Sequence, residues 1–358
     1  MSQSKFIDKP TVIRKGEDLN PERLEAYLNG ILRGKGGKLK IEQFPSGFSN
    51  LTYLLRLGER ELVLRRPPFG ANIKSAHDMG REYEVLSKLT NVYPKAPRPL
   101  LYCDNDSIIG APFYVMQRVQ GIILRSRLPK GLDLTPHIMA GISTSFIDNL
   151  VDLHQVNYAA AGLSELGHPD GYVARQVSGW TKRYRNAQTN KIAELDNVMA
   201  WLAENMPVNG NSSLIHNDYK YDNIVLDPAD LTKVIAVLDW EMATLGDPLM
   251  DLGTTLGYWT EKNEPDELSF GPTRLPGNLN RQELVDHYIE KSGVDINNPL
   301  FYYVFGLFKL AVIVQQIYAR YKKGYTQDAR FAHLIDVVRA CAKMATLALE
   351  KDRIHHLV

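Results

Sequence analysis

The pattern of apolar and polar positions divides this chain into a first part with short strand-like runs and a longer part with helical spacing. In the first part, apolar runs bounded by turn residues predict antiparallel strands. These runs lie over residues 39–44, 51–57, 61–65, 100–103 and 113–119. A helix is predicted from Asn20-Pro21, where a capping residue precedes a proline, and another over 80–86. These elements predict a small lobe built on a sheet.

Beyond residue 119, apolar side chains recur at the spacing of amphipathic helices. The predicted helices lie over 138–154, 191–206, 281–291, 299–322 and 327–352. The longest apolar run, Phe301 to Val314, is interrupted by Lys309 and is too short to span a bilayer, so it predicts a buried helix. Residues 171–185 combine arginines with aromatic residues, which predicts either the wall of a pocket for an anionic ligand or a solvated helix face.

The helical spacing is interrupted over residues 214–253 by two short apolar runs with polar side chains at their ends. The runs 224–226 and 234–238 flank a turn and predict a hairpin. Carboxylate and amide groups gather at the edges of this hairpin, while the strands between them are nearly uncharged. Such groups need partners when they lie near apolar strands. The arrangement therefore suits cation binding better than a folding core.

Three polar residues of this stretch have the spacing of a phosphoryl-transfer site. In the pattern His-x-Asp-x-x-x-x-Asn, the Asp (here Asp218) accepts a hydroxyl proton and the Asn (here Asn223) holds Mg²⁺. Asp239, after the next strand, adds a carboxylate of the kind that Mg²⁺ binds together with phosphate oxygens. Lys220 is close enough in sequence to offset charge on the transferring phosphoryl group. We therefore predict Asp218 and Lys220 as catalytic, and Asn223 and Asp239 as Mg²⁺ ligands.

This stretch resembles the aminoglycoside phosphotransferase and choline kinase family, which has a protein-kinase-like fold. The resemblance rests on an ordered set of residues: His216, Asp218, Asn223, Asp239-Trp240 and the trailing Gly246-Asp247-Pro248-x-x-Asp251-Leu252. It implies that His216 is structural, and that Asp247 and Asp251 brace the loop that carries Asp218. The amino-acid sequences of the motifs are most similar to those of a branch of kinase-like domains that are fused to acyl-CoA dehydrogenases.

The resemblance also implies a nucleotide-covering loop in the first lobe. Residues 45–50, which include Gly47, Ser49 and Asn50, take the position of that loop. A small-residue loop between two strands can close over phosphates with its backbone N–H groups, although the same sequence is also that of an ordinary hairpin turn.

Further nucleotide contacts follow from the same resemblance. Arg65 stands where the family carries a phosphate-binding Lys, and Glu82 is its predicted partner. Backbone groups near Gln117 and Val119 would pair with the adenine edge. Because Arg and Lys are not interchangeable at such a position, Arg65 is also an argument for a member that binds nucleotide without transferring phosphate.

Composition agrees with a two-lobed α+β protein. The 358 residues are enough for two lobes, predicted here as 1–118 for nucleotide binding and 119–358 for catalysis and acceptor binding. A net charge of +1 gives no reason to expect nucleic acid or an anionic membrane as a partner. Cys103 and Cys341 are too few for a disulfide framework, and the N-terminus lacks the apolar core of a secretory signal. We expect a cytoplasmic monomer or homodimer.

The predicted activity is ATP- and Mg²⁺-dependent transfer of a phosphoryl group to a hydroxyl of a small molecule. The acceptor would be a hydroxy acid, a hydroxyacyl-CoA or an aminoglycoside-like compound. A nucleotide-binding pseudokinase is one alternative, supported by Arg65 and opposed by the intact set of Asp218, Asn223 and Asp239. A metal-dependent hydrolase that uses His216 is another, but it leaves Asn223 and the sheet lobe unexplained.

Overall fold

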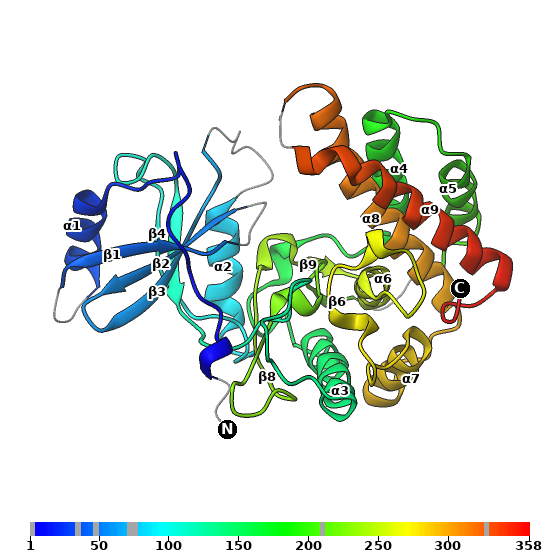
Figure 1. The fold of residues 1–358 in the computed structure, drawn as a ribbon, viewed down its shortest axis with the longest axis horizontal. Helices are drawn as coiled ribbons and strands as arrows, with labels where there is room; N and C mark the ends of the chain where they lie inside the picture. The colour runs from blue at the N-terminus through cyan, green and yellow to red at the C-terminus, as the bar shows by residue number, and fades with distance from the viewer. Residues whose placement is uncertain (1–3, 33–36, 46–49, 70–77, 208–211, 326–328) are drawn as a thin grey trace.

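The protein folds into two lobes that lie side by side, a sheet lobe at the N-terminal end and a mainly helical lobe (Figure 1). The computed structural model describes residues 4–32, 37–45, 50–69, 78–207, 212–325 and 329–358. The predicted architecture, a small antiparallel sheet followed by a larger helical part, is confirmed.

Five antiparallel strands form the sheet of the first lobe, in the order β1-β2-β3-β5-β4. They are β1 (Leu39–Gln43), β2 (Leu51–Leu57), β3 (Arg60–Arg66), β4 (Pro99–Cys103) and β5 (Phe113–Gln117). The strands agree with the predicted runs, except that the fifth ends at Gln117 instead of 119. The inner strands β2, β3 and β5 are largely apolar because both faces of the sheet are covered there, whereas the edge strands β1 and β4 keep exposed positions such as Lys40 and Tyr102.

Two helices cover the two faces of this sheet. Helix α1 (Pro21–Ile31) begins as predicted, with the Asn20 side chain accepting a hydrogen bond from the Arg23 N–H. Leu24 and Leu28 of α1 pack with alternate sheet residues such as Leu55. Helix α2 (Met79–Leu89) packs on the opposite face, toward the second lobe, and is longer than the predicted 80–86. The residues of β3 therefore alternate between two apolar cores.

Seven α-helices are described in the second lobe. They are α3 (Pro136–His154), α4 (Tyr172–Ala187), α5 (Ala193–Glu204), α6 (Pro248–Tyr258), α7 (Arg281–Ser292), α8 (Pro299–Lys322) and α9 (Leu334–Lys351). The predicted start of the last helix at 327 is wrong, because residues 329–333 form a separate 3-10 turn before α9. The other predicted helices are found within a few residues of their expected ends.

Helix α8 is the central helix of this lobe. By length and composition it is the one helix among the described residues that could cross a membrane, but 78% of its apolar window is buried inside the protein. Helix α6 packs directly on it: a Cβ atom added at Gly306 would lie 1.9 Å from the Gly253 carbonyl oxygen. This approach of two backbones is open only to glycine, and it brings α8 close to the polar stretch that α6 follows.

Two small strand pairs frame that polar stretch. The predicted hairpin is confirmed as β7 (Ile224–Leu226) paired with β8 (Val234–Val237). A second pair, β6 (Ser213–Ile215) with β9 (Thr244–Gly246), encloses it from the outside. Residues 216–223, called the 216–223 loop below, connect β6 to β7.

Candidate active site

The start of the 216–223 loop is fixed by a buried carboxylate from α6. Asp251 accepts hydrogen bonds from the backbone N–H groups of His216 and Asn217, both at 2.7 Å. His154 of α3 lies 3.1 Å from the same carboxylate and 2.8 Å from the hydroxyl of Tyr288. Burial alone would raise the pKa of Asp251, but the hydrogen bonds and charges of these histidines lower it. Asp251 thus braces the loop, in the supporting place that the resemblance implied.

His216 has the geometry of a structural histidine. Its ring is fully buried, and its Nε2 lies 2.9 Å from the Leu238 carbonyl oxygen. Its Nδ1 accepts a hydrogen bond from the Asp218 N–H at 3.3 Å. Burial lowers the pKa of His216, so the neutral ring donates from Nε2 and accepts at Nδ1. The ring therefore ties the loop to the end of β8.

Asp218 lies at the centre of a ring of hydrogen-bond donors. Lys220 Nζ is 2.8 and 3.0 Å from its two carboxylate oxygens, and Asn223 Nδ2 is 2.9 Å from Oδ2. The Tyr258 hydroxyl, at the end of α6, donates to Oδ1 at 2.9 Å. Burial of Lys220 disfavours its charge, yet the Asp218 carboxylate raises the pKa of this lysine above its usual value. Asp218 and Lys220 therefore form a charged pair in which the carboxylate is held in one orientation.

Asp239 follows β8 and is paired with Arg65 of the sheet lobe. The backbone of Asp239 is left-handed, with φ 67° and ψ 67°, which turns its side chain toward the other lobe. Arg65 Nη2 donates to Asp239 Oδ1 at 2.8 Å, and its Nη1 lies 3.4 Å from Glu82 Oε1. The predicted ion pair between Arg65 and Glu82 is confirmed, and the contact with Asp239 was not predicted.

Arg65 and Asp239 support each other's charge, whereas burial and the nearby Asp239 raise the pKa of Glu82. Burial disfavours the charge of Arg65, but Asp239 and Glu82 together raise its pKa well above the usual value. Burial would also raise the pKa of Asp239, and the charge of Arg65 lowers it instead. The Nε of Arg65 is buried without a hydrogen-bond partner within the described part of the chain. An unused donor on a buried guanidinium is suited to an incoming phosphate oxygen.

Asn223 and Asp239 can supply oxygen ligands side by side. The Leu238 N–H donates to the Asn223 carbonyl at 2.7 Å, which places the residue before Asp239 against Asn223. Asn223 Nδ2 donates to the main chain and the side chain of Asp218, so its Oδ1 is the end of the amide that can bind a cation. Across the residues that the structure describes, no three His, Cys, Asp or Glu side chains converge on a metal position. Two protein oxygens match Mg²⁺, which keeps water and phosphate as its other ligands.

The predicted nucleotide contacts of the sheet lobe are placed only in part. Gly47 and Ser49 lie outside the described residues. Asn50 is buried and its side-chain amide donates to Glu241, across the two lobes. The Gln117 N–H donates to the Arg98 carbonyl at 2.8 Å, so this donor is already used. Val119 packs on a small apolar cluster of Ile123, Val225 and Ala236, and the last two residues belong to the hairpin of β7 and β8.

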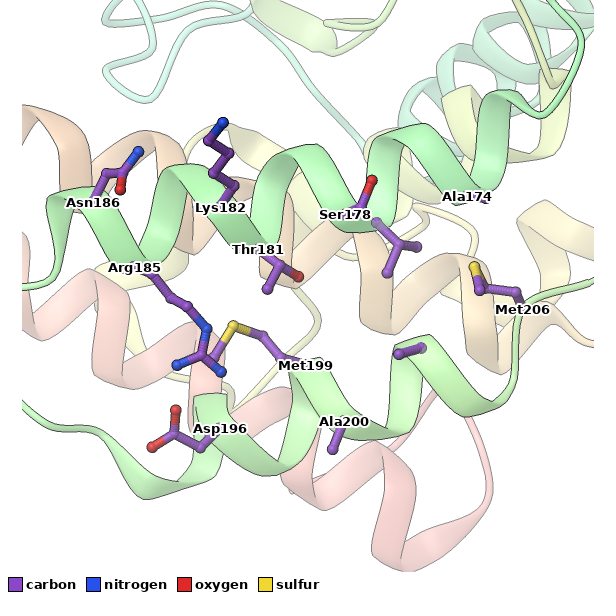
Figure 2. A pocket seen from close by; sticks show the side chains of 12 residues that line it. Ala174, Ser178, Thr181, Lys182, Arg185, Asn186, Asp196, Met199, Ala200 and Met206 are labelled. Carbon is purple, nitrogen blue, oxygen red and sulfur yellow. The ribbon is translucent and has the colours of Figure 1, made fainter.

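The arginine-rich segment does not line a pocket beside Asp218. Its aromatic residues Tyr172, Trp180 and Tyr184 are buried as the core face of α4. Arg185 and Lys182 instead line a groove of about 640 Å³ between α4 and α5, shown in Figure 2. The groove contains none of the residues around Asp218. The segment thus has a buried aromatic face and, through Lys182 and Arg185, also forms part of the wall of this groove.

The sequence reasoning missed several residues that contact the site. Tyr258 contacts Asp218, and Lys309 of α8 reaches the 216–223 loop from the opposite side. Arg81 of α2 donates to the carbonyl oxygens of Glu241 and Ala243, at 3.1 and 2.6 Å. Of these residues, Lys309 alone has a visible signal in the sequence, because it is a charged residue inside the apolar run of α8.

The fold and this site define a kinase-like phosphotransferase. The chain belongs to the phosphotransferase enzyme family, whose model matches residues 40–269. Acyl-CoA dehydrogenase family member 11 of Rattus norvegicus is 39% identical over 321 residues, which are 84% of this chain and 39% of that protein. Member 10 of Mus musculus is 34% identical, over 93% of this chain and 31% of that protein. The chain thus spans less than half the length of these relatives.

A solved structure agrees with this assignment. A Ralstonia eutropha JMP134 protein assigned as an aminoglycoside phosphotransferase is 30% identical, with a TM-score of 0.79 over 93% of this chain and 99% of that one. The predicted family, the protein-kinase-like fold, and the similarity to proteins named as acyl-CoA dehydrogenases are therefore confirmed. By family and fold, the protein is related to small-molecule phosphotransferases.

Proposed function

We propose that this chain transfers the γ-phosphoryl group of ATP to a hydroxyl of a small molecule, with Mg²⁺ as the metal. The observation that carries the proposal is the orientation of Asp218, whose carboxylate is held by Lys220, Asn223 and Tyr258 at 2.8–3.0 Å. A carboxylate in a fixed orientation can accept a hydroxyl proton in the direction of attack. Family membership supports the reaction class.

The roles of the residues follow from their contacts. Asp218 orients the acceptor hydroxyl and takes its proton, while Lys220 holds the carboxylate and places positive charge near the transferring group. Asn223 and Asp239 would hold Mg²⁺, which neutralises charge on the phosphates when it is bound. Arg65 would turn from Asp239 to the phosphates, where its planar fork can bind two oxygens.

We propose a hydroxy acid or a hydroxyacyl-CoA as the acceptor, in preference to an aminoglycoside. Two relatives are named as acyl-CoA dehydrogenases, which act on acyl thioesters by their printed names. Because the chain spans only part of those proteins, their names support the acceptor class and do not decide it. The solved relative assigned as an aminoglycoside phosphotransferase supports the other choice.

A pseudokinase is the second candidate, and one observation favours it. Arg65 already neutralises Asp239, so the side chain expected to bind the metal carries an internal cation. If this pair does not open, nucleotide could bind without transfer. Measurement of phosphoryl transfer separates the two functions.

The test is ADP formation from Mg²⁺–ATP across hydroxy acids, hydroxyacyl-CoA compounds and aminoglycosides. The control is Asp218→Asn, which keeps the shape of the side chain but removes the base. We expect acceptor-dependent ADP formation by the wild type and a loss of at least about 100-fold in the variant, the size of effect that a general base contributes. ATP affinity should stay within about threefold, because Asp218 does not hold the nucleotide. Full activity of Asp218→Asn would refute the assignment, and ATP binding without transfer to any acceptor would favour the pseudokinase.

A further inference from the structure

Asn217, directly before Asp218, is held by four elements of the second lobe. Its backbone is left-handed, with φ 66°, a conformation that a residue other than glycine keeps where its surroundings hold it. Asp251 accepts its N–H at 2.7 Å, and Asn217 Nδ2 donates to the Met242 carbonyl at 3.1 Å. The Tyr172 hydroxyl of α4 lies 3.3 Å from its Oδ1. The fourth contact comes from α8.

Lys309 makes that contact from inside the apolar helix α8. Its side chain is 2% exposed, and its Nζ donates to the Asn217 carbonyl at 2.9 Å. The same Nζ lies 3.3 Å from Asn217 Oδ1 and 3.3 Å from Thr254 Oγ1. An ammonium has three protons, and these three acceptors satisfy all of them. Burial of a charge is costly, so an apolar residue would serve packing better at this position.

The bond to the Asn217 carbonyl acts on Asp218 through one rigid unit. The Asn217 carbonyl and the Asp218 N–H belong to the same planar peptide group. Lys309 holds its oxygen at 2.9 Å, and His216 Nδ1 accepts from its N–H at 3.3 Å. With both ends of the peptide group held, the peptide plane that carries the Asp218 Cα atom is fixed in orientation.

The position of Lys309 is itself fixed by backbone contact between helices. Gly253 of α6 and Gly306 of α8 touch without any side chain between them, and Lys309 lies one turn after Gly306. Thr254, next to Gly253, is the α6 residue that contacts Lys309. The ammonium therefore cannot drift from the loop unless the two helices separate.

We propose that Lys309 is a positioning residue for phosphoryl transfer, which aims Asp218 by holding the peptide group between Asn217 and Asp218. The proposal rests on the proposed function, because it assigns Lys309 a part in that reaction. Among the described residues, the polar contacts of Lys309 are with Asn217 and Thr254, so we expect it to act through the loop.

The charge of Lys309 gives the proposal a pH signature. Burial lowers its pKa to about 8, opposed by the carboxylates of Asp251 and Asp218 and assisted by Lys220 and Arg183. These are the charged groups that face it from α6, from the 216–223 loop and from α4. As pH rises through about 8, the ammonium loses a proton and its hold on the carbonyl weakens, so transfer should slow.

Stability should respond to the same titration with the opposite sign. An unfolded lysine keeps its proton up to about pH 10.4. Between about 8 and 10.4, the unfolded chain therefore binds more protons at Lys309 than the folded chain does, and this residue's contribution to stability rises with pH. A residue that served folding alone would not make activity fall while stability gains.

The decisive comparison is wild type, Lys309→Met and Lys309→Arg, with Lys322→Met of the same helix as the matched control. We expect Lys309→Met to lower kcat by about 10- to 100-fold, the effect of a misplacement of about 1 Å, with KM for ATP within about twofold. Its alkaline decline in kcat near pH 8 should disappear, because no titratable group remains at this position. Lys309→Arg keeps the charge and should shift the decline to higher pH. A kcat within twofold of wild type with an unchanged pH profile would overturn the proposal.

Two further measurements keep the proposal testable. If Lys309→Met fails to fold, Thr254→Val removes one of the three acceptors, and it should lower kcat severalfold; no change would count against the proposal. Amide hydrogen exchange of residues 214–223 can be measured without a phosphoryl-acceptor substrate. We expect at least tenfold faster exchange in Lys309→Met, with unchanged ATP affinity. Unchanged exchange would refute the positioning role, whereas faster exchange in a protein that transfers no phosphate would contradict the proposed function alone.

Discussion

At the scale of single residues, the site is organised by charges that are buried and paired. Arg65 illustrates this, since it reaches Asp239 at 2.8 Å and Glu82 at 3.4 Å with a side chain that is 8% exposed. Breaking such a pair from one side leaves the other charge buried and uncompensated. Substitutions at these positions must therefore keep the charge if they are to report on function instead of folding.

Arg65→Lys is the substitution that meets this condition. Lys keeps the charge but cannot reach both carboxylates or bind a phosphate with two N–H groups, so we expect kcat/KM for ATP to fall by about tenfold or more. The control is Arg56→Lys. Arg56 is a half-exposed arginine on the neighbouring strand that pairs with Glu42 and Glu61, and its replacement should leave kcat/KM for ATP unchanged. Steady-state kinetics with varied ATP measures both. An Arg65→Lys enzyme that is faster than wild type would instead mean that Arg65 blocks Asp239, as in a pseudokinase.

Some residues of the site can be predicted from the sequence alone, and others cannot. Asp218, Asn223 and Asp239 were found because the spacing of a phosphoryl-transfer loop is local in sequence. The partner Glu82 was found through a family pattern. Tyr258 and Lys309 were missed because they contact the loop from helices far along the chain. No local pattern records which turn of a distant helix will face the 216–223 loop.

At the scale of elements, glycines decide how closely α6 and α8 approach. We expect Gly306→Ala to destabilise the protein by roughly 1–3 kcal/mol through overpacking, because its Cβ would lie 1.9 Å from the Gly253 carbonyl oxygen. Gly179→Ala on α4 is the matched control: apart from its own helix backbone, no described residue comes within 4 Å of its added Cβ, so it should gain up to about 1 kcal/mol from helix propensity. Urea unfolding of both variants measures the difference. Equal effects at the two positions would show that the helices can separate without cost.

Elements were predicted well where the pattern is periodic, and poorly where packing decides. The inner strands β2, β3 and β5 and the helix α8 follow from apolar runs, because these elements are largely buried. The start of α9 was placed too early because the 3-10 turn at 329–333 has no signal in side-chain spacing. Helix α6 is not predicted from the sequence, because its glycines disfavour a helix. Their packing against α8 explains why the helix forms.

At the scale of the whole molecule, several of the contacts between the lobes converge on one segment after β8. Arg65, Asn50 and Arg81 of the first lobe contact side chains or carbonyls of Asp239, Glu241 and Ala243, and the Glu82 carboxylate accepts the Trp240 N–H at 3.2 Å. The ring of Trp240 lies 4.9 Å from that of His216. The packing of His216 is thus continuous with the contact between the lobes, and its protonation should affect both.

That continuity predicts how the protein responds to acid. Burial lowers the pKa of His216, whereas an unfolded histidine titrates near 6.5. As pH falls through about 6.5, the unfolded chain takes up a proton that the folded ring refuses, so stability present above this pH is progressively lost below it. A proton on Nδ1 would also oppose the Asp218 N–H, which now donates to that nitrogen. We therefore expect the melting temperature to fall between pH 7 and pH 5.

His216→Asn provides the comparison for this prediction. The amide of Asn can donate toward the Leu238 carbonyl but does not titrate, so the variant should be less stable than wild type at pH 7, where it loses the buried ring, and should lose less stability on acidification. Melting temperatures at pH 7 and 5 measure both effects. His333, which is largely exposed on the 3-10 turn before α9, gives the control, because His333→Asn should leave the pH dependence unchanged. If wild type and His216→Asn lost the same stability between these pH values, acid sensitivity would have to come from the carboxylates, and Asp251, whose charge holds the loop, would be the residue to test.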